Sequence, residues 1–150
     1  MADKLSIADR SALMSRIKAK NTRPEIAVRR ALFASGFRFR IHSKDLPGKP
    51  DIVLKKFKCA IFVHGCFWHG HDCRKGTTLP KSNKEKWIAK LNSNKQRDQI
   101  NEESLRRQGW HVFIIWECEL TDSICRLQQF LERQRACASA KIVSTTFAAD

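Results

Sequence analysis

The chain has 150 residues, which is enough for one domain with a substantial hydrophobic core but cramped for two. It carries 29 Lys and Arg against 15 Asp and Glu, and this net charge of +14 makes nucleic acid the leading candidate partner. No stretch approaches the roughly 20 apolar residues of a membrane span or begins like a secretory signal, so we expect a cytoplasmic protein with reduced cysteines and no membrane partner.

The chain begins with a basic segment that a predicted helix follows. Residues 1–20 form either a basic arm that clamps a polyanion and is mobile without it, or an amphipathic helix that packs on the rest of the protein. Beyond this arm, Thr22 is a typical helix cap, Pro24 suits a first turn and Gly36 is a typical stop. The pattern predicts a helix between them, with Glu25 in its first turn.

Three later segments have the composition of β-strands. "PDIVLKK" and "KCAIFVHG" are short, apolar and rich in β-branched residues, and a basic turn separates them, which predicts two neighbouring strands. "WHVFIIWE" is apolar enough to predict a third strand in the centre of the sheet.

Helices are predicted between and after these strands. Residues 82–109 have helix-forming composition. Their candidate core positions are Trp87, Leu91, Ile100 and Leu105. An amphipathic pattern over 121–135 predicts a last helix, and the small, polar residues of 138–150 predict a flexible C-terminal tail. We therefore expect an α/β protein, with a central mixed β-sheet flanked by helices, folded as one domain over residues 21–137.

The stretch "VHGCFWHGHDC" places three histidines and two cysteines within one loop. Clustered cysteines in a reducing compartment are first candidates for metal ligands, and Cys66, His71 and Cys73 have a spacing that can wrap one ion. Cys118, just after the predicted third strand, is the candidate fourth ligand of a structural Cys3His zinc site. His69 could replace His71, and spacing does not choose between them. The alternative is a pair of buried thiols with surface histidines.

An acidic residue and a histidine are predicted to meet at one end of the strand pair. Asp51 begins the first strand and His64 ends its neighbour, so an antiparallel hairpin would bring both to the same edge. A carboxylate that holds a hydrated cation, beside a group that activates water, is what phosphodiester cleavage requires. Asp51 alone is weak support because Pro-Asp often marks only a turn, but His64, His69 and the basic charge strengthen it.

Four separated motifs carry a family resemblance. "KAKNTRPE", "LPGKPDIVL", "FVHGCFWHGHDC" and "GWHVFIIWECEL", spread over residues 10–120, resemble the very short patch repair (Vsr) DNA mismatch endonucleases, relatives of the PD-(D/E)xK restriction endonuclease-like fold. The resemblance implies an endonuclease domain and a Mg²⁺-dependent enzyme. Its substrate would be double-stranded DNA with a T·G mismatch, the product of 5-methylcytosine deamination, nicked 5′ of the thymine in that strand.

The resemblance also implies roles for individual residues. Asp51 and the main-chain carbonyl of Val63 would hold magnesium, and Glu25 would act through metal-bound water. His69 would be the base that activates water, and His64 would contact the phosphate or the transition state.

The resemblance implies one more catalytic residue, and the sequence departs from the wider nuclease superfamily at one motif. Asp98 would support His69 from the following helix. The usual acidic-x-Lys of the wider nuclease superfamily is replaced here by residues 62–64, Phe-Val-His, as the narrower Vsr family would have it. The competing interpretation is that His64 and His69 only support the zinc or the loop.

Aromatic side chains in the same loop suggest how a mismatch would be detected. Inserted apolar side chains unstack a base step more easily where pairing is already defective. Phe67 and Trp68 suit such a wedge, because neighbours in an extended segment point to opposite sides and cannot easily share one core. Core packing is the alternative, and it is strong for Trp87. The resemblance places Trp87, Lys90 and Asn94 against DNA as well. With Phe67 and Trp68 of the wedge, and Met14 of the basic arm reaching a groove, they make up the candidate DNA contacts.

Two other functions compete with a mismatch endonuclease. A restriction-like endonuclease would cut both strands of a fixed site, and a zinc-stabilised DNA-binding module would not cut at all. The four candidate catalytic groups disfavour the second, since a pure binder does not need Glu25, Asp51, His64 and His69. We expect a monomer, and mismatch-repair proteins are candidate partners.

Overall fold

The computed structural model of the chain describes residues 6–146, which contain a four-stranded mixed sheet in the order β1-β2-β3-β4. The strands are β1 (Arg40–Ile41), β2 (Ile52–Leu54), β3 (Cys59–His64) and β4 (His111–Trp116). The first three are antiparallel neighbours, whereas β4 runs parallel to β3. Parallel neighbours need a crossover connection, and helix α4 (Lys84–Arg107) provides it.

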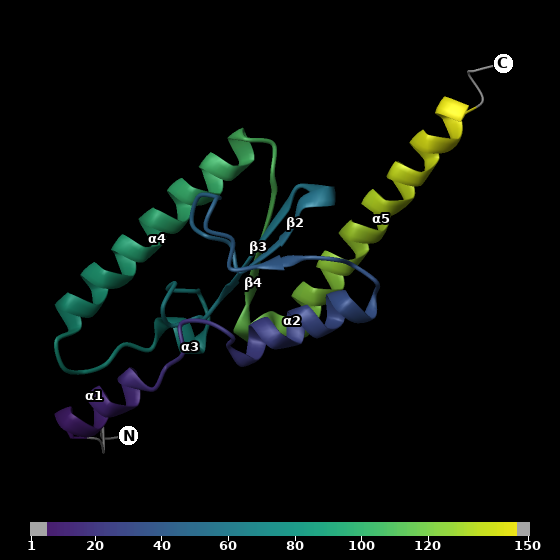
Figure 1. Ribbon diagram of the computed structural model, residues 1–150. Helices are drawn as coiled ribbons and strands as arrows, with labels where there is room; N and C mark the ends of the chain where they lie inside the picture. Colours follow the sequence, from purple (N-terminus) through teal and green to yellow (C-terminus); the bar gives the residue numbers. More distant parts are fainter. Residues whose placement is uncertain (1–5, 147–150) are drawn as a thin grey trace.

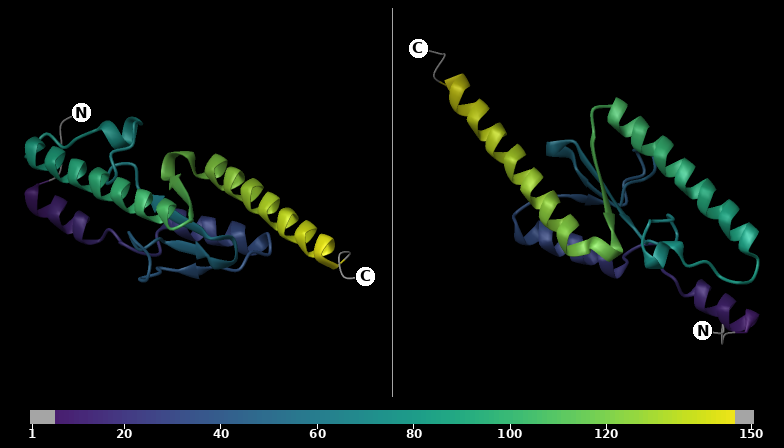
Figure 2. Two further views of the ribbon diagram at one scale, coloured as in Figure 1. Left: turned by 90° about the horizontal axis from the view of Figure 1, so that it is seen from above. Right: turned by 180° about the vertical axis from the view of Figure 1, so that it is seen from behind.

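Helices cover both faces of this sheet, as Figures 1 and 2 show. Helices α2 (Arg23–Ala34) and α5 (Leu120–Thr146) pack on one face, and α4 packs on the other. The larger core, under α2 and α5, includes Val28, Leu32, Ile52, Leu54, Ile61, Ile115, Leu127 and Leu131. The smaller core, under α4, includes Ala60, Phe62 and Leu105. The predicted α/β layering is confirmed.

Strand alternation decides which side chains meet at the sheet end. Ile52 pairs with Ile61 across the β2–β3 ladder, and both face the core under α2 and α5. Because successive side chains point to opposite faces, Asp51 and His64 fall on the α4 side. The predicted pairing of these two strands, and the convergence of an acidic residue with a histidine, are therefore both found.

Local signals explain where α2 begins. The Thr22 hydroxyl accepts a hydrogen bond from the Glu25 amide at 3.4 Å, and Pro24 occupies the first turn. The predicted helix is confirmed, and its cap fixes Glu25 at the end nearest the sheet edge that carries Asp51.

Two expectations about the fold are wrong, and one segment has more regular secondary structure than expected. Strand β4 was predicted in the centre of the sheet, but it lies at the edge. Its apolar side chains are covered on the two faces of the sheet by α4 and α5. Ile100 is 59% exposed, whereas Leu91 and Leu105 of the same helix are buried as predicted. The expected tail at 138–150 is helical as far as Thr146, because α5 continues through it. Residues 147–150 lie outside the described part.

The N-terminal segment forms a helix that contributes nothing to the core. Helix α1 (Ile7–Ser15) has no buried residue, and Ile7 is 90% exposed. Its packing on the domain is therefore slight, which disfavours an amphipathic packing role. Within residues 6–146, no helix has the length and apolar character needed to cross a membrane.

Candidate functional site

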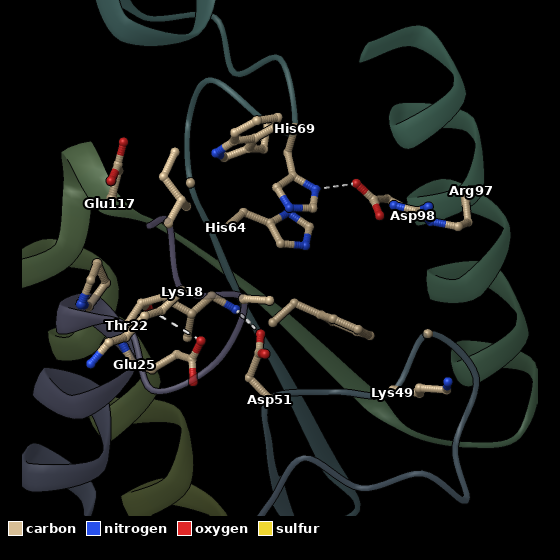
Figure 3. Close-up of a pocket in the computed structure, with 18 of the residues that line it drawn as sticks. Lys18, Thr22, Glu25, Lys49, Asp51, His64, His69, Arg97, Asp98 and Glu117 are labelled. Atoms are coloured by element: carbon tan, nitrogen blue, oxygen red, sulfur yellow. Dashed lines mark hydrogen bonds and ion pairs between the residues drawn. The ribbon is translucent and has the colours of Figure 1, made fainter. Parts of the chain in front are cut away.

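A cavity of about 620 Å³ opens at the end of the sheet where β2 begins and β3 ends. The segment after α1, the start of α2, the loop after β3 and the middle of α4 all contribute side chains to it. Figure 3 shows His64 and His69 facing each other above Asp51 and Glu25, with Asp98 reaching in from α4. The sequence-predicted catalytic residues therefore lie in one pocket, and Met14 lines its rim.

Asp51 lies immediately before β2, where its side chain is hydrogen-bonded to the neighbouring strand β3. Its Oδ2 accepts a hydrogen bond from the Val63 amide at 2.8 Å, which fixes one carboxylate oxygen across the β2–β3 ladder. Burial raises the pKa of the Asp51 carboxyl, and the nearby Glu25 carboxylate raises it further. A buried carboxylate that is costly to ionise and lies beside a second carboxylate is a favourable site for a divalent cation, whose charge offsets that cost.

Glu25 is buried to 2% exposure and is bound by several donors. Its Oε2 accepts from the Arg29 guanidinium at 2.8 Å and from the Asn21 amide at 3.0 Å. The Thr22 hydroxyl lies 3.3 Å from Oε1. These contacts compensate for the burial of the carboxylate and hold it in one orientation.

Sequence reasoning missed His42 as a member of this group. Its ring can offer a nitrogen within 4.8 Å of carboxylate oxygens of Glu25 and Asp51. The only sequence signal was the pairing of β1 with β2. Ile41 pairs with Ile52, so His42, which follows Ile41, lies opposite Asp51, which precedes Ile52. A two-residue strand gives too little pattern to predict that pairing.

The two pocket histidines are stacked and only one has a carboxylate partner. Their ring centroids are 3.6 Å apart with planes inclined by 2°, and His69 Nδ1 lies 2.5 Å from Asp98 Oδ2. Burial, reinforced by His69 and Arg97, lowers the pKa of His64 to about 3. His64 is therefore neutral at pH 7, and its buried Nδ1 has no hydrogen-bond partner within the described part of the chain.

The predicted zinc ligands converge on one point beyond this pocket. Ligand atoms of Cys66, His71, Cys73 and Cys118 all lie within 4.8 Å of one another, and His71 Nδ1 is 3.3 Å from Cys118 Sγ. A tetrahedral zinc site with Zn–S bonds of about 2.3 Å separates its sulfurs by roughly 3.8 Å, so the donor set fits that ion. His71, rather than His69, accompanies the cysteines.

The electrostatics of this cluster differ from thiol to thiol. Hydrogen bonding from the Gly76 amide, with smaller help from His71, lowers the pKa of the Cys73 thiol to about 7. Burial raises the pKa of Cys66 to about 12 and that of Cys118 as well. Without a cation only Cys73 readily loses its proton, and a bound metal ion would draw off the others.

Gly76 is required by the close approach of helix α3 (Arg74–Thr77) to the cluster loop. A Cβ at this position would lie 1.9 Å from the His71 carbonyl oxygen, a backbone atom that cannot move aside cheaply.

We expect Gly76→Ala to lower the free energy of unfolding by about 2 kcal/mol or more, because the loop must shift to admit the methyl group. Denaturant melts measure this. Gly65→Ala is the matched control, since its Cβ would meet only Trp68 Cδ1 at 3.4 Å. Equal stability of the two variants would contradict the close approach.

Three aromatic rings form a half-buried cluster at the surface beside the pocket. Phe67 lies 5.1 Å from Trp68 and 5.4 Å from Trp87, measured between ring centroids. Lys90 Nζ stands 5.1 Å from the Trp68 ring, and Asn94 donates to the Trp68 carbonyl oxygen at 2.9 Å. All five predicted DNA contacts of this region are thus adjacent.

One argument for the wedge is corrected by this geometry. The loop after β3 is a turn over residues 66–70, not an extended segment, so Phe67 and Trp68 pack edge-to-face on the same side. They form one surface with Trp87 instead of pointing apart. None of the three rings is buried, which disfavours a pure core role.

Comparison with known proteins agrees with the geometry of this pocket. The family model described as "DNA mismatch endonuclease Vsr" matches residues 2–75. A type II nicking enzyme, V.XorIIP of Xanthomonas oryzae pv. oryzae, is 52% identical over 122 residues, covering 81% of this chain and 89% of the relative. The chain belongs to the Vsr family. This confirms the resemblance found in the sequence motifs and makes the protein a DNA endonuclease.

Other Vsr relatives are similar over most of their length. The type II nicking enzyme V.NmeAIP of Neisseria meningitidis serogroup A is 48% identical over 127 residues, covering 84% of this chain and 90% of the relative. The DNA mismatch endonuclease Vsr of Escherichia coli is 39% identical over 120 residues, covering 80% of this chain and 76% of the relative.

Proposed function

We propose that this Vsr-family endonuclease recognises a T·G mismatch in double-stranded DNA and nicks the thymine-bearing strand 5′ of that base, with Mg²⁺ as its catalytic cofactor. The observation that carries the proposal is the adjacency of two structures on one loop. His64 and His69 line a pocket with Asp51 and Glu25, and Phe67 and Trp68, which lie between the two histidines in the sequence, form a half-buried aromatic surface. Detection of a base and cleavage beside it would thus use one rigid segment.

The pocket residues divide the work of hydrolysis. Asp51, with the main-chain carbonyl of Val63, would hold the magnesium ion, and Glu25 would hold a water of its shell. The cation supplies the positive charge that offsets negative charge on the phosphoryl group. His69 would take the proton of the attacking water, and Asp98 would fix its tautomer by accepting from Nδ1. His64, neutral at pH 7, would donate to the phosphate without adding charge.

Zinc is proposed for the cluster of three cysteines and His71. It would tie the loop after β3 to the segment after β4, two strands that are parallel neighbours. Because the turn over residues 66–70 has little core of its own, the metal would supply the stability that keeps the aromatic surface in place.

One assay tests the proposed function directly. Strand-labelled duplexes carrying T·G, G·C or T·A at one position are incubated with and without Mg²⁺. We expect a nick only in the T-bearing strand of the T·G duplex and only with the metal. A break in both strands would instead support a restriction-like enzyme, and retardation without cleavage a binding module. Two of the relatives are named type II nicking enzymes, which favours the single-strand outcome.

Removing the aromatic surface should remove mismatch selectivity. The double variant Phe67→Ala, Trp68→Ala is expected to lower the T·G preference over matched duplex by about 10-fold or more, since each stacked base contributes roughly 1–3 kcal/mol. Competition binding without Mg²⁺ measures it. Phe33→Ala is the control, because Phe33 is 78% exposed on α2, away from the pocket. Unchanged discrimination in the double variant would reject the wedge.

Asp98, the partner of His69, should affect the rate of nicking and not the affinity for DNA. Asp98→Asn is expected to slow single-turnover nicking on the order of 10²-fold, because an amide can stabilise the wrong imidazole tautomer. DNA affinity should stay within about twofold. Asp122→Asn, an exposed change at the start of α5, is the control. A rate equal to that of the wild type would show that His69 does not depend on Asp98.

A further inference from the structure

His42 is tied by its backbone to the residue that begins strand β2. Its amide donates to the Asp51 carbonyl oxygen at 2.9 Å, one step beyond the Ile41–Ile52 pair of the β1–β2 ladder. The backbone of His42 is left-handed, with φ of 48°, and this turns the chain away from the strand at that point. The conformation is uncommon for a residue other than glycine, so the surrounding contacts must hold it.

The side chain of His42 reaches from this strand end to helix α2. Its Nε2 lies 3.2 Å from Glu25 Oε2 and 3.1 Å from a terminal nitrogen of Arg29. The His42 side chain is 18% exposed and that of Glu25 3%. One residue therefore contacts Asp51 through its backbone and Glu25 through its ring.

Arg29 decides between two roles for this ring. A permanently charged guanidinium that touches both His42 Nε2 and Glu25 Oε2 would repel a cation from those two atoms. His42 is therefore poorly placed as a metal ligand, although its nitrogen lies close enough to both carboxylates to be counted among candidate ligands. Nε2 then has two possible roles, which depend on the imidazole tautomer: it accepts from Arg29, which can only donate, or it donates to Glu25 Oε2.

The two oxygens of Glu25 have unequal environments. Oε2 lies within 3.2 Å of nitrogen atoms of Asn21, Arg29 and His42, whereas among residues 6–146 the only hydrogen-bond contact of Oε1 is the Thr22 hydroxyl, at 3.3 Å. Oε1 therefore keeps acceptor capacity on the side of the cavity that Glu25 lines. A carboxylate anchored by one oxygen and open at the other suits contact with a water bound to a cation.

We propose that His42 is a positioning residue for the metal site of the nicking reaction, donating from Nε2 to Glu25 Oε2 so that Oε1 faces the pocket. The inference rests on the proposed function, because it assigns Glu25 the metal-bound water. It adds a residue that contacts both acidic groups. The His42 backbone fixes the position of Asp51 at the start of β2, and the His42 ring fixes the orientation of the Glu25 carboxylate. Outer hydrogen bonds of this kind change metal affinity by about 10- to 100-fold.

The test compares His42→Leu, which keeps a side chain of similar size but cannot donate, with His42→Gln, whose amide can. His111→Gln, on the exposed side of β4, is the matched control. We expect His42→Leu to raise the half-saturating Mg²⁺ concentration for nicking by about 10-fold or more. Binding to the T·G duplex without Mg²⁺ should change little, and the melting temperature should fall by similar amounts in His42→Leu and His42→Gln, because both replace the residue of the left-handed turn. His42→Gln should recover most of the lost Mg²⁺ affinity.

Several results would overturn the role. An unchanged Mg²⁺ half-saturation in His42→Leu would do so, and so would a His42→Gln protein as defective as His42→Leu. Equal losses of Mg²⁺ affinity, DNA affinity and melting temperature would make His42 merely structural.

A second measurement does not depend on activity. Nitrogen NMR of the imidazoles should report a proton on His42 Nε2 whose resonance moves in Glu25→Gln. A proton on Nδ1 instead would refute the proposed donor. If the wild type does not nick T·G duplexes but this resonance still moves, then the proposed function fails and the His42–Glu25 link stands.

Discussion

Asp51→Asn should reduce Mg²⁺-dependent nicking on the order of 10³-fold or more while leaving DNA binding intact. The amide keeps the size of the side chain and can still accept from the Val63 amide, but it cannot supply the charge that holds a hard cation. Removing a negative charge that faces phosphate should even strengthen binding slightly. Single-turnover nicking and binding of a T·G duplex are measured side by side. Asp45→Asn, an exposed change in the preceding loop, is the control.

The same variant should be at least as stable as the wild type. Burial raises the pKa of Asp51 in the folded state above its pKa in the unfolded chain. The ionised carboxylate therefore lowers the stability of the wild type once the pH exceeds the unfolded-state pKa. The melting-temperature difference, variant minus wild type in Mg²⁺-free buffer, should therefore increase from pH 4 to pH 8. Nicking that survives the substitution would remove Asp51 from the metal site, and a melting difference that falls with pH would contradict the raised pKa.

Loss of the zinc cluster should unfold much of the pocket. Cys118→Ser is expected to abolish stoichiometric zinc and to lower the free energy of unfolding by about 4 kcal/mol, because loss of a structural metal is among the largest single-site effects. For a chain of this length that corresponds to a fall in melting temperature of roughly 10 °C. Metal analysis of the purified protein and thermal melts measure both quantities.

A cysteine outside the cluster provides the comparison. Cys137→Ser, exposed on α5, should keep one zinc per chain and the wild-type melting temperature. Chelation should destabilise the wild type and Cys137→Ser alike, and should leave Cys118→Ser unchanged. A Cys118→Ser protein that still holds one zinc would refute the assignment of the fourth ligand.

Much of this arrangement was readable from the sequence because short-range rules determine it. The Thr22 cap, the paired β2 and β3 segments and the alternation of side chains along them suffice to bring Glu25, Asp51 and His64 to one edge. The cysteine spacing likewise predicted the cluster, with Cys118 as its distant member.

Long-range packing determined what the sequence could not decide. Apolar content cannot distinguish a central strand from an edge strand covered by helices, so β4 was misplaced. The choice between His69 and His71 depended on Asp98, which lies 29 positions beyond His69 on α4 and draws that ring into the pocket. His42 was missed because its partners meet it only through tertiary contacts.

The turn after β3 limits which sequence changes the protein can accept without losing its site. Between His64 and Cys73 the chain supplies the two pocket histidines, two aromatic rings in edge-to-face contact and three members of the cysteine and histidine cluster. An inserted or deleted residue there would displace all of these groups together. Under the proposed function, a new mismatch preference would be accessible through exchange of individual side chains at constant loop length, for instance at Phe67 or Trp68, and not through longer or shorter loops.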